Sequence, residues 1–264
     1  MLGAIAGDVI GSVYEGWGSV PADFDPLFAR ESRFTDDSVL TVAVADALLN
    51  GGELVRLLKD YARTYPRAGY GGTFLRWMRS ETLEPYGSWG NGSAMRASPA
   101  GFAAETLEEA VRLGRWSAEV THNHPEGIKG AEATAAAIFL ARTGEEKDAI
   151  RAYIEAAFEY DLSVSLAALR ARREFDVSCQ GTVPASLRAF FDSTDFEHAV
   201  RLAVSMGGDT DTQACITGGI AQAYYGGVPP KIREKTLARL TPSLRAVVEA
   251  FESRYPGQPA KHSS

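Results

Sequence analysis

Helical periodicity along most of the 264-residue chain limits what this sequence can fold into. Residues 125–142 and 212–225 are rich in alanine and glycine, which allow helices to approach closely and suit central positions in a helical assembly. Strand-like alternation between turn signals is hard to find. The sequence therefore predicts an all-α fold, a single compact multi-helix domain with its chemistry in loops and helix ends at one mouth.

Local signals mark where several helices begin and end. Apolar side chains over residues 39–49 are followed by two glycines, which predict a helix that stops there. Pro66 ends a second amphipathic segment that begins near Leu54. Two capping boxes predict the starts of further helices: Thr106 with Glu109, and Thr194 with Glu197.

Composition narrows the classes of function and partner. A hydrophobic content of 45% over this length supports one large core, so we expect one domain over residues 1–255 and a flexible tail over 256–264. The net charge of −7 disfavours nucleic acid or an anionic membrane as a partner. No apolar span suits a bilayer, no signal peptide is recognisable, and two isolated cysteines favour a reducing compartment. We expect a cytoplasmic monomer that acts on a small molecule or a modified protein.

Two short segments place hydroxyl and carboxylate groups directly before apolar helices. The first contains Thr35, Asp36 and Asp37, and the second contains Asp209, Asp211 and Thr212. Taken singly, each reads as an ordinary helix start, with a capping side chain and acidic residues at the positive end of the dipole. Both helices, however, are too apolar for the surface, so the two acidic turns are candidates for one shared site.

If the two helices are neighbours, four carboxylates converge and repel one another unless positive charge compensates them. Two divalent cations would balance that charge. Carboxylate and hydroxyl oxygens suit Mg²⁺, Mn²⁺ or Ca²⁺, whereas the lack of clustered cysteine and histidine argues against zinc. The residue types alone make a binuclear oxygen-ligand site plausible.

The chain resembles the ADP-ribosylglycohydrolase family, of the dinitrogenase-reductase-activating glycohydrolase and ADP-ribosyl-acceptor hydrolase type. The resemblance spans nearly the whole chain and rests on six segments in family order: GDVIGSVYEG, FTDDSVLTVAVADAL, GNGSAMRASPAG, THNHPEG, CQGTVPASLRAFF and GGDTDTQACITGGIAQAYYG. It implies an all-α fold that holds two Mg²⁺ ions, with Mn²⁺ as an alternative. It also implies hydrolysis of the N- or O-glycosidic bond between ADP-ribose and an acceptor.

The resemblance assigns expected roles to particular residues. It makes the two acidic turns the metal ligands, and it implies that Glu15 gates or contacts the site. Asp8, Gly11, Ser12 and Glu15 would share one face if a single helix carried them. Asp8 could equally belong to a solvated stripe. We expect the cations to orient the distal ribose and to lower the pKa of a water, with Glu15 or Asp36 moving protons.

A glycine loop at residues 89–96 is the expected substrate-binding segment. Backbone N–H groups before a helix can hold a pyrophosphate, although such a loop is also a common turn. The resemblance places four residues of this loop in contact with ADP-ribose: Asn91, Gly92, Ser93 and Met95. Arg96 would support them or simply lie on the surface.

Nearby aromatic and histidine side chains complete the expected substrate contacts. Of His122 and His124, we expect only His122 to contact a phosphate or ribose. Tyr86 and Trp89 could stack on adenine, although aromatic side chains there as often serve packing.

Two rival functions fit parts of the same pattern. A non-catalytic ADP-ribose-binding module would bind the nucleotide without turnover, but the complete set of candidate ligands argues against it. A metal-dependent nucleotide phosphohydrolase would use a similar metal pair. Its products would be AMP or phosphate, whereas glycosidic cleavage releases intact ADP-ribose. The acceptor linkage depends on loops such as residues 16–33 and is not readable from the sequence.

Overall fold

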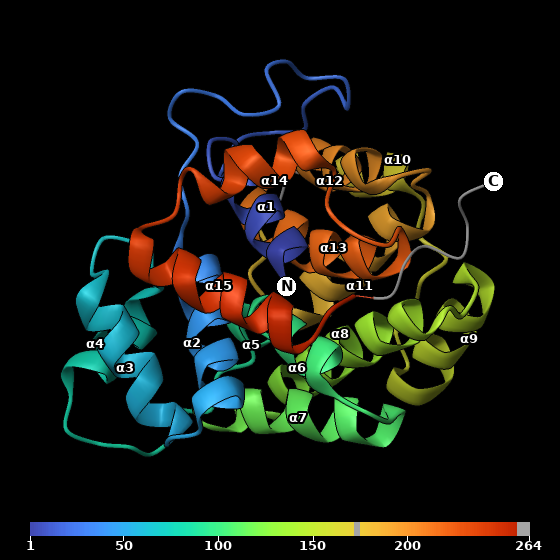
Figure 1. Ribbon diagram of the computed structural model, residues 1–264. Helices are drawn as coiled ribbons and strands as arrows, with labels where there is room; N and C mark the ends of the chain where they lie inside the picture. The colour runs from blue at the N-terminus through green and yellow to red at the C-terminus, as the bar shows by residue number, and fades with distance from the viewer. Residues whose placement is uncertain (172–174, 258–264) are drawn as a thin grey trace.

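The computed structural model describes residues 1–171 and 175–257 (Figure 1). These residues form fifteen helices and no β-strand, with one isolated bridge between Gly90 and Ser178. The all-α prediction is confirmed. The helices are α1 (Leu2–Gly11), α2 (Asp36–Asn50), α3 (Leu54–Thr64), α4 (Gly72–Arg79), α5 (Gly92–Met95), α6 (Ser98–Ala103), α7 (Leu107–Glu119), α8 (Pro125–Thr143), α9 (Lys147–Phe158), α10 (Leu166–Ala171), α11 (Cys179–Phe191), α12 (Phe196–Ser205), α13 (Thr210–Tyr224), α14 (Pro230–Leu237) and α15 (Pro242–Arg254).

The centre of the fold is the pair α1 and α13, which lie side by side (Figure 1). Gly3, Gly7 and Gly11 of α1 face α13 so closely that a Cβ atom at Gly7 would lie 1.9 Å from the carbonyl oxygen of Ala214. Glycines spaced four residues apart lie on one face of a helix, so the two backbones can touch along the whole contact. This contact brings the start of α13 beside the end of α1.

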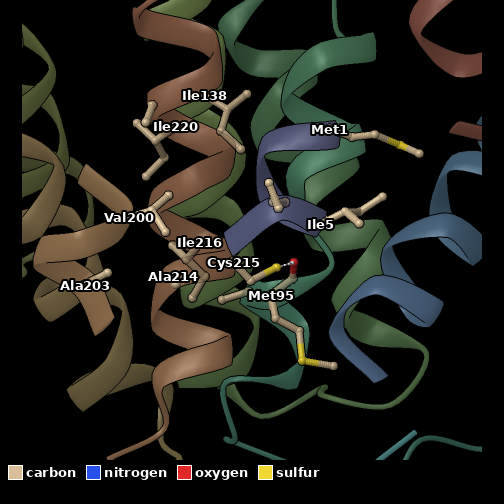
Figure 2. Packing of buried hydrophobic residues seen from close by; sticks show 14 of the residues in the cluster. Met1, Ile5, Met95, Ile138, Val200, Ala203, Ala214, Cys215, Ile216 and Ile220 are labelled. Atoms are coloured by element: carbon tan, nitrogen blue, oxygen red, sulfur yellow. Dashed lines mark hydrogen bonds between the residues drawn. The ribbon is translucent and has the colours of Figure 1, made fainter. Parts of the chain in front are cut away.

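Apolar side chains from several helices pack around this pair (Figure 2). Ile5 of α1, Ile216 and Ile220 of α13, Ile138 of α8 and Val200 of α12 are all buried. Figure 2 also shows the thiol of Cys215, which donates to the carbonyl oxygen of Met95 at 3.3 Å. The two alanine- and glycine-rich segments thus lie in α8 and α13, at the centre of the molecule as expected.

Several expected helix boundaries are confirmed and two are wrong. Thr106 caps α7 by accepting a hydrogen bond from the N–H of Glu109. Asp195, rather than Thr194, caps α12 by accepting from the N–H of His198, because a carboxylate stands one residue nearer the helix start. Helix α1 ends at Gly11, so Glu15 lies in the turn beyond it and not on the helix.

None of the helices in the described ranges combines the length and apolar character needed to cross a bilayer. The expected C-terminal tail over residues 256–264 lies outside the described residues from position 258 onward. Most of residues 12–35 connect α1 to α2 without a regular helix. This long connection carries Glu15 at one end and Thr35 at the other, so it frames the site described next.

Candidate metal centre and substrate cavity

Asp8, near the end of α1, holds the start of α2 in place. Its Oδ2 accepts a hydrogen bond from the N–H of Thr35 at 2.9 Å, and its Oδ1 accepts from the Thr35 hydroxyl at 2.7 Å. The N–H of Ser38 donates to the same Oδ2 at 3.1 Å, and the Ser38 hydroxyl donates there as well. Asp8 is fully buried. Its carboxylate therefore anchors the first acidic turn rather than belonging to a solvated stripe.

The first acidic turn combines helix capping with inward-facing carboxylates. Thr35 is the N-cap of α2, and its Oγ1 accepts from the N–H of Asp37 at 3.3 Å. The N–H of Asp36 donates to the carbonyl oxygen of Ala68 at 2.8 Å, which ties the turn to the segment before α4. The turn therefore caps α2 as an ordinary helix start does. Because Thr35 and Asp37 are buried, the same residues can also belong to the candidate site.

The second acidic turn reaches the same region from α13. Gly207 and Gly208 have φ angles of 75° and 76°, a conformation that favours glycine, and a Cβ atom at Gly207 would lie 2.6 Å from the backbone of Gly18. The turn places Asp209 at the N-cap of α13, where its Oδ2 accepts from the Nδ2 of Asn91 at 2.7 Å. Asp211 follows in the first turn of the helix and is buried.

Two groups of three carboxylates meet at this point. Oxygen atoms of Asp8, Asp37 and Asp211 lie within 4.8 Å of one another, and so do oxygen atoms of Glu15, Asp209 and Asp211. Asp211 belongs to both groups. The two acidic turns are separated by more than 170 positions in the sequence, and the contact between α1 and α13 brings them together.

Burial and mutual repulsion disfavour the charged forms of these carboxylates. Loss of solvent raises the pKa of Asp36 to about 8, and the charge of Asp8 adds to the shift. Burial raises the pKa of Asp8 to about 6 against the opposing effect of its hydrogen bonds. The pKa values of Asp37 and Asp211 are raised well above the usual range by burial and by neighbouring carboxylates. A cation bound among these carboxylates would favour their charged forms and offset this cost.

The donor set fits hard divalent cations. The Oδ1 atom of Asp37 is buried and has no hydrogen-bond partner among the described residues. The ion pairs found within residues 1–171 and 175–257 include none between an arginine or lysine and an aspartate of this centre. Carboxylate and hydroxyl oxygens are the ligands that Mg²⁺ and Mn²⁺ prefer.

A cavity of about 370 Å³ opens over the centre. Its walls include Asp36, Asp37, Asp209, Asp211 and Thr212, so five of the six expected metal ligands face one space. Thr35, the sixth, lies behind them in contact with Asp8. Glu15 stands at the exposed side of the cavity, where burial and the charge of Asp209 raise its pKa.

The glycine loop also contributes to the wall of the cavity. Asn91, Gly92 and Met95 line the cavity. Asn91 is buried and donates to both Asp209 and Thr182, so it orients a candidate ligand. The Ser93 hydroxyl is also buried, and it donates to the carbonyl oxygen of Gly127 at 2.6 Å, which commits this side chain to the protein interior. Helix α5 is only four residues long.

The two histidines lie in different surroundings. His122 is buried and lines the cavity, whereas His124 is the N-cap of α8 and accepts from the N–H of Glu126. Tyr86 lines the cavity and packs against His122 at 5.9 Å between ring centroids, while Trp89 is 51% exposed on the outer side of the loop. Arg96 is fully buried, so the reading that it lies on the surface is wrong.

Sequence reasoning left out several residues of this site. Gly69, Gly71 and Gly72 line the cavity, and a Cβ atom at Gly69 would lie 3.3 Å from a carboxylate oxygen of Asp36. The signal was available, because the closely spaced glycines of residues 69–72 are typical of a segment that approaches another group closely. Ser38 gave no such signal, since a serine in the first turn of a helix is ordinary.

Fold and site together define the class of this protein: an all-helical protein with a carboxylate-rich centre at the wall of a cavity. A family model described as ADP-ribosylglycohydrolase matches residues 1–260. The chain belongs to the ADP-ribosylglycohydrolase family.

Curated relatives and a solved structure agree with this assignment. ADP-ribosylhydrolase ARH3 of Danio rerio is 25% identical, with 86% of this chain and 81% of the relative covered. ADP-ribosylarginine hydrolase Tri1 of Pseudomonas putida (strain GB-1) is 24% identical, with 89% and 72% covered. ADP-ribosyl-dinitrogen reductase glycohydrolase of Rhodospirillum rubrum is 26% identical, with 85% and 81% covered. A solved ADP-ribosylglycohydrolase-related protein complex has a TM-score of 0.70 at 25% identity over 96% of both chains.

Proposed function

We propose that this protein hydrolyses the N- or O-glycosidic bond between ADP-ribose and an acceptor, either a modified protein side chain or a small molecule, with the help of two divalent cations, Mg²⁺ or Mn²⁺. The observation that carries the proposal is the pair of three-carboxylate groups that share Asp211 at the wall of the cavity. The names of the relatives, among them an ADP-ribosylarginine hydrolase, support the same class of bond.

The six oxygen-bearing residues of the two acidic turns would hold the cations. When bound, the cations supply positive charge that neutralises the carboxylates and polarises the hydroxyl groups of a sugar. The residues concerned are Thr35, Asp36, Asp37, Asp209, Asp211 and Thr212.

The hydrolysis itself requires one proton transfer away from water and one toward the acceptor. Water forms the new bond to the anomeric carbon, the bond to the acceptor breaks, and the acceptor leaves with a proton. Glu15 is suited to carry this proton, because it lies at the cavity wall and its raised pKa brings it closer to neutral pH. Asp36, which also lines the cavity, is the alternative carrier. The transition state should be oxocarbenium-like, as in other glycoside hydrolysis.

The glycine loop and its neighbours would orient the substrate. Gly92 keeps one wall open, because a Cβ atom there would lie 3.1 Å from the Nε2 atom of His122. Met95 contributes apolar surface and His122 a polar ring to the same cavity. These contacts would hold the ADP-ribose while the acceptor extends toward the exposed side near Glu15.

Product analysis tests the proposal directly. Purified protein is incubated with ADP-ribosylated protein in excess MgCl₂, and the released nucleotide is identified by chromatography and mass spectrometry. We expect intact ADP-ribose, and its release should stop when a chelator removes the divalent cations. Release of AMP would instead identify a nucleotide phosphohydrolase, and binding of ADP-ribose without turnover would identify a binding module. Either result would contradict the proposal.

A matched pair of variants tests the role of Glu15. Glu15→Gln should lower kcat by roughly 10²- to 10⁴-fold, the usual contribution of general acid–base catalysis. Glu31→Gln, which alters an exposed carboxylate of the same long connection, should leave kcat unchanged. Substrates linked through arginine, through serine and through small-molecule acceptors then define the preferred linkage. Full activity of Glu15→Gln on every substrate would assign the proton transfer to another group.

A further inference from the structure

The buried guanidinium of Arg96 has no acidic partner to explain its position. Among the ion pairs of the described residues, none involves Arg96. Its Nε and Nη2 atoms donate to the carbonyl oxygen of Ser117 at 3.2 and 2.7 Å, and Nη1 has no hydrogen-bond partner within the described part of the chain. Burial lowers the pKa of Arg96 only to about 10, so the side chain is charged at neutral pH. A buried, unpaired charge is costly and calls for a reason.

Arg96 also reaches a buried hydroxyl. Its Nη2 atom donates to the Oγ1 atom of Thr121 at 2.6 Å, and Thr121 is fully buried. The same Oγ1 lies 2.7 Å from the Nδ1 atom of His122. Thr121 thus joins the guanidinium of Arg96 to the imidazole of His122.

The chemistry of these groups selects one arrangement of protons. A guanidinium can only donate hydrogen bonds, so Thr121 Oγ1 must be an acceptor toward Arg96. The hydrogen of this fully buried hydroxyl then needs an acceptor of its own. The imidazole nitrogen is the acceptor at hydrogen-bonding distance, so Nδ1 of His122 carries no proton in this arrangement.

The other ring nitrogen faces the substrate cavity. A Cβ atom at Gly92 would lie 3.1 Å from Nε2 of His122, and one at Gly90 would lie 3.8 Å from it, so Nε2 is next to the glycine loop that lines the cavity. Burial and the nearby charge of Arg96 lower the pKa of His122 well below its usual range, which disfavours a second proton on the ring. A single proton on Nε2 would point at the glycine-loop wall.

We propose that Arg96 and Thr121 are positioning residues, which hold His122 as the neutral tautomer protonated on Nε2, so that the imidazole offers a hydrogen-bond donor to an acceptor atom of the substrate. The identity of the ligand, ADP-ribose, rests on the proposed function, whereas the tautomer does not. The buried guanidinium of Arg96 therefore acts without touching the substrate, because it orients the Thr121 hydroxyl.

The tautomer can be measured without any substrate. Long-range ¹H–¹⁵N spectra of the ¹⁵N-labelled protein at neutral pH distinguish a protonated from an unprotonated ring nitrogen, and His122→Gln identifies the signals of His122. We expect an unprotonated Nδ1 and a protonated Nε2. A proton on Nδ1 of His122 in the wild-type protein, or on both ring nitrogens, would overturn the proposal.

A matched pair of substitutions then tests the positioning role. Thr121→Val keeps the shape of the side chain but removes the hydroxyl, whereas Thr121→Ser retains it. Thr121→Val should remove the preference of His122 for one tautomer. It should also weaken the binding of ADP-ribose by roughly five- to thirtyfold, as measured by calorimetry in MgCl₂. Thr121→Ser should preserve the wild-type tautomer and stay within about twofold of wild-type affinity. Equal spectra and equal affinity for the two variants would refute the positioning role. Failure of the wild-type protein to bind ADP-ribose would contradict the proposed function and leave the tautomer result to stand by itself.

Discussion

The hydroxyl of Thr35 donates to the carboxylate of Asp8 at 2.7 Å, across 27 positions of sequence. The hydrogen bond joins the end of α1 to the start of α2, and it directs an oxygen-rich turn toward the start of α13. A second contact from Thr35 Oγ1, at 3.2 Å to Asp37 Oδ2, extends the chain of polar groups into the centre. Asp8 therefore acts on the site through the residues that it orients.

Replacing Asp8 should weaken cation binding, although Asp8 lies on α1 and outside both acidic turns. In Asp8→Asn the amide oxygen can still accept from the N–H groups of Thr35 and Ser38, but the amide NH₂ group then faces the Thr35 hydroxyl, which loses its acceptor on Asp8. We expect Mg²⁺ affinity to fall by roughly 10- to 100-fold, as for other residues that orient metal ligands. Calorimetric titration with MgCl₂ measures this change. Asp23→Asn, at an exposed position, is the control, and unchanged affinity in Asp8→Asn would refute the anchoring role.

The metal-free protein should lose stability as the pH rises. The pKa values of Asp8 and Asp36, about 6 and about 8 in the folded chain, lie above the ordinary value of 3.8, so the folded state binds more protons than the unfolded state. The contribution of these two carboxyl groups to the free energy of unfolding is therefore fully present below about pH 4, and it declines as the pH rises from about 4 to about 8. We expect a lower Tm at pH 8 than at pH 5 in EDTA, with a change of about 2–4 °C for each kcal/mol.

Excess MgCl₂ should reduce the fall in Tm between pH 5 and pH 8. The cations compensate the deprotonated carboxylates and stabilise the folded state that binds them. The measurement is a pair of thermal melts at each pH, with EDTA and with MgCl₂. A metal-free Tm that rises steadily from pH 5 to pH 8 would show that these carboxylates do not repel one another in the folded protein.

Removing one charge from the centre should have opposite effects with and without metal. In Asp211→Asn the amide keeps an oxygen for the N–H of Thr212, which donates to Asp211 Oδ1 at 3.0 Å, but the repulsion from Asp37 and Asp209 disappears. In EDTA at pH 8 we expect the variant to be more stable than wild type, because burial and neighbouring carboxylates disfavour the charged form of Asp211. Its Tm should no longer rise with MgCl₂. Denaturant unfolding with and without the cation checks both effects, and a variant less stable than wild type in EDTA would contradict the repulsion argument.

Close packing of α1 on α13 should be sensitive to one methyl group. Gly7→Ala would place a Cβ atom 1.9 Å from the carbonyl oxygen of Ala214, so the two helices would have to separate. We expect a loss of about 1–3 kcal/mol, typical of overpacking. A weaker response to MgCl₂ should follow, since the same contact sets the distance between Asp8 and Asp211. The control is Gly18→Ala, whose Cβ atom would meet no other atom within 4 Å. Equal unfolding free energies for the two variants would disprove the backbone contact.

The local part of this protein was determined by its sequence alone. The spacing of apolar residues and the turn signals located α2, α3, α7, α8 and α13 to within a few residues, because helix formation depends on neighbours three and four positions apart. The residue types of the two acidic turns also indicated hard-cation ligands before any contact was known. The local signal at Thr194 predicted the wrong N-cap for α12, since Asp195 competes for the same capping position.

Tertiary structure alone decided what those residues do together. No local signal showed that Asp8 would anchor Thr35 and Ser38, or that Arg96 would be buried behind His122. Such contacts join segments far apart in the chain, and they arise from the packing of α1 against α13 and from the burial of polar groups that must then find partners. The charge on each carboxylate is likewise a property of the assembled centre, because burial and neighbouring charges set its pKa only after the helices have met.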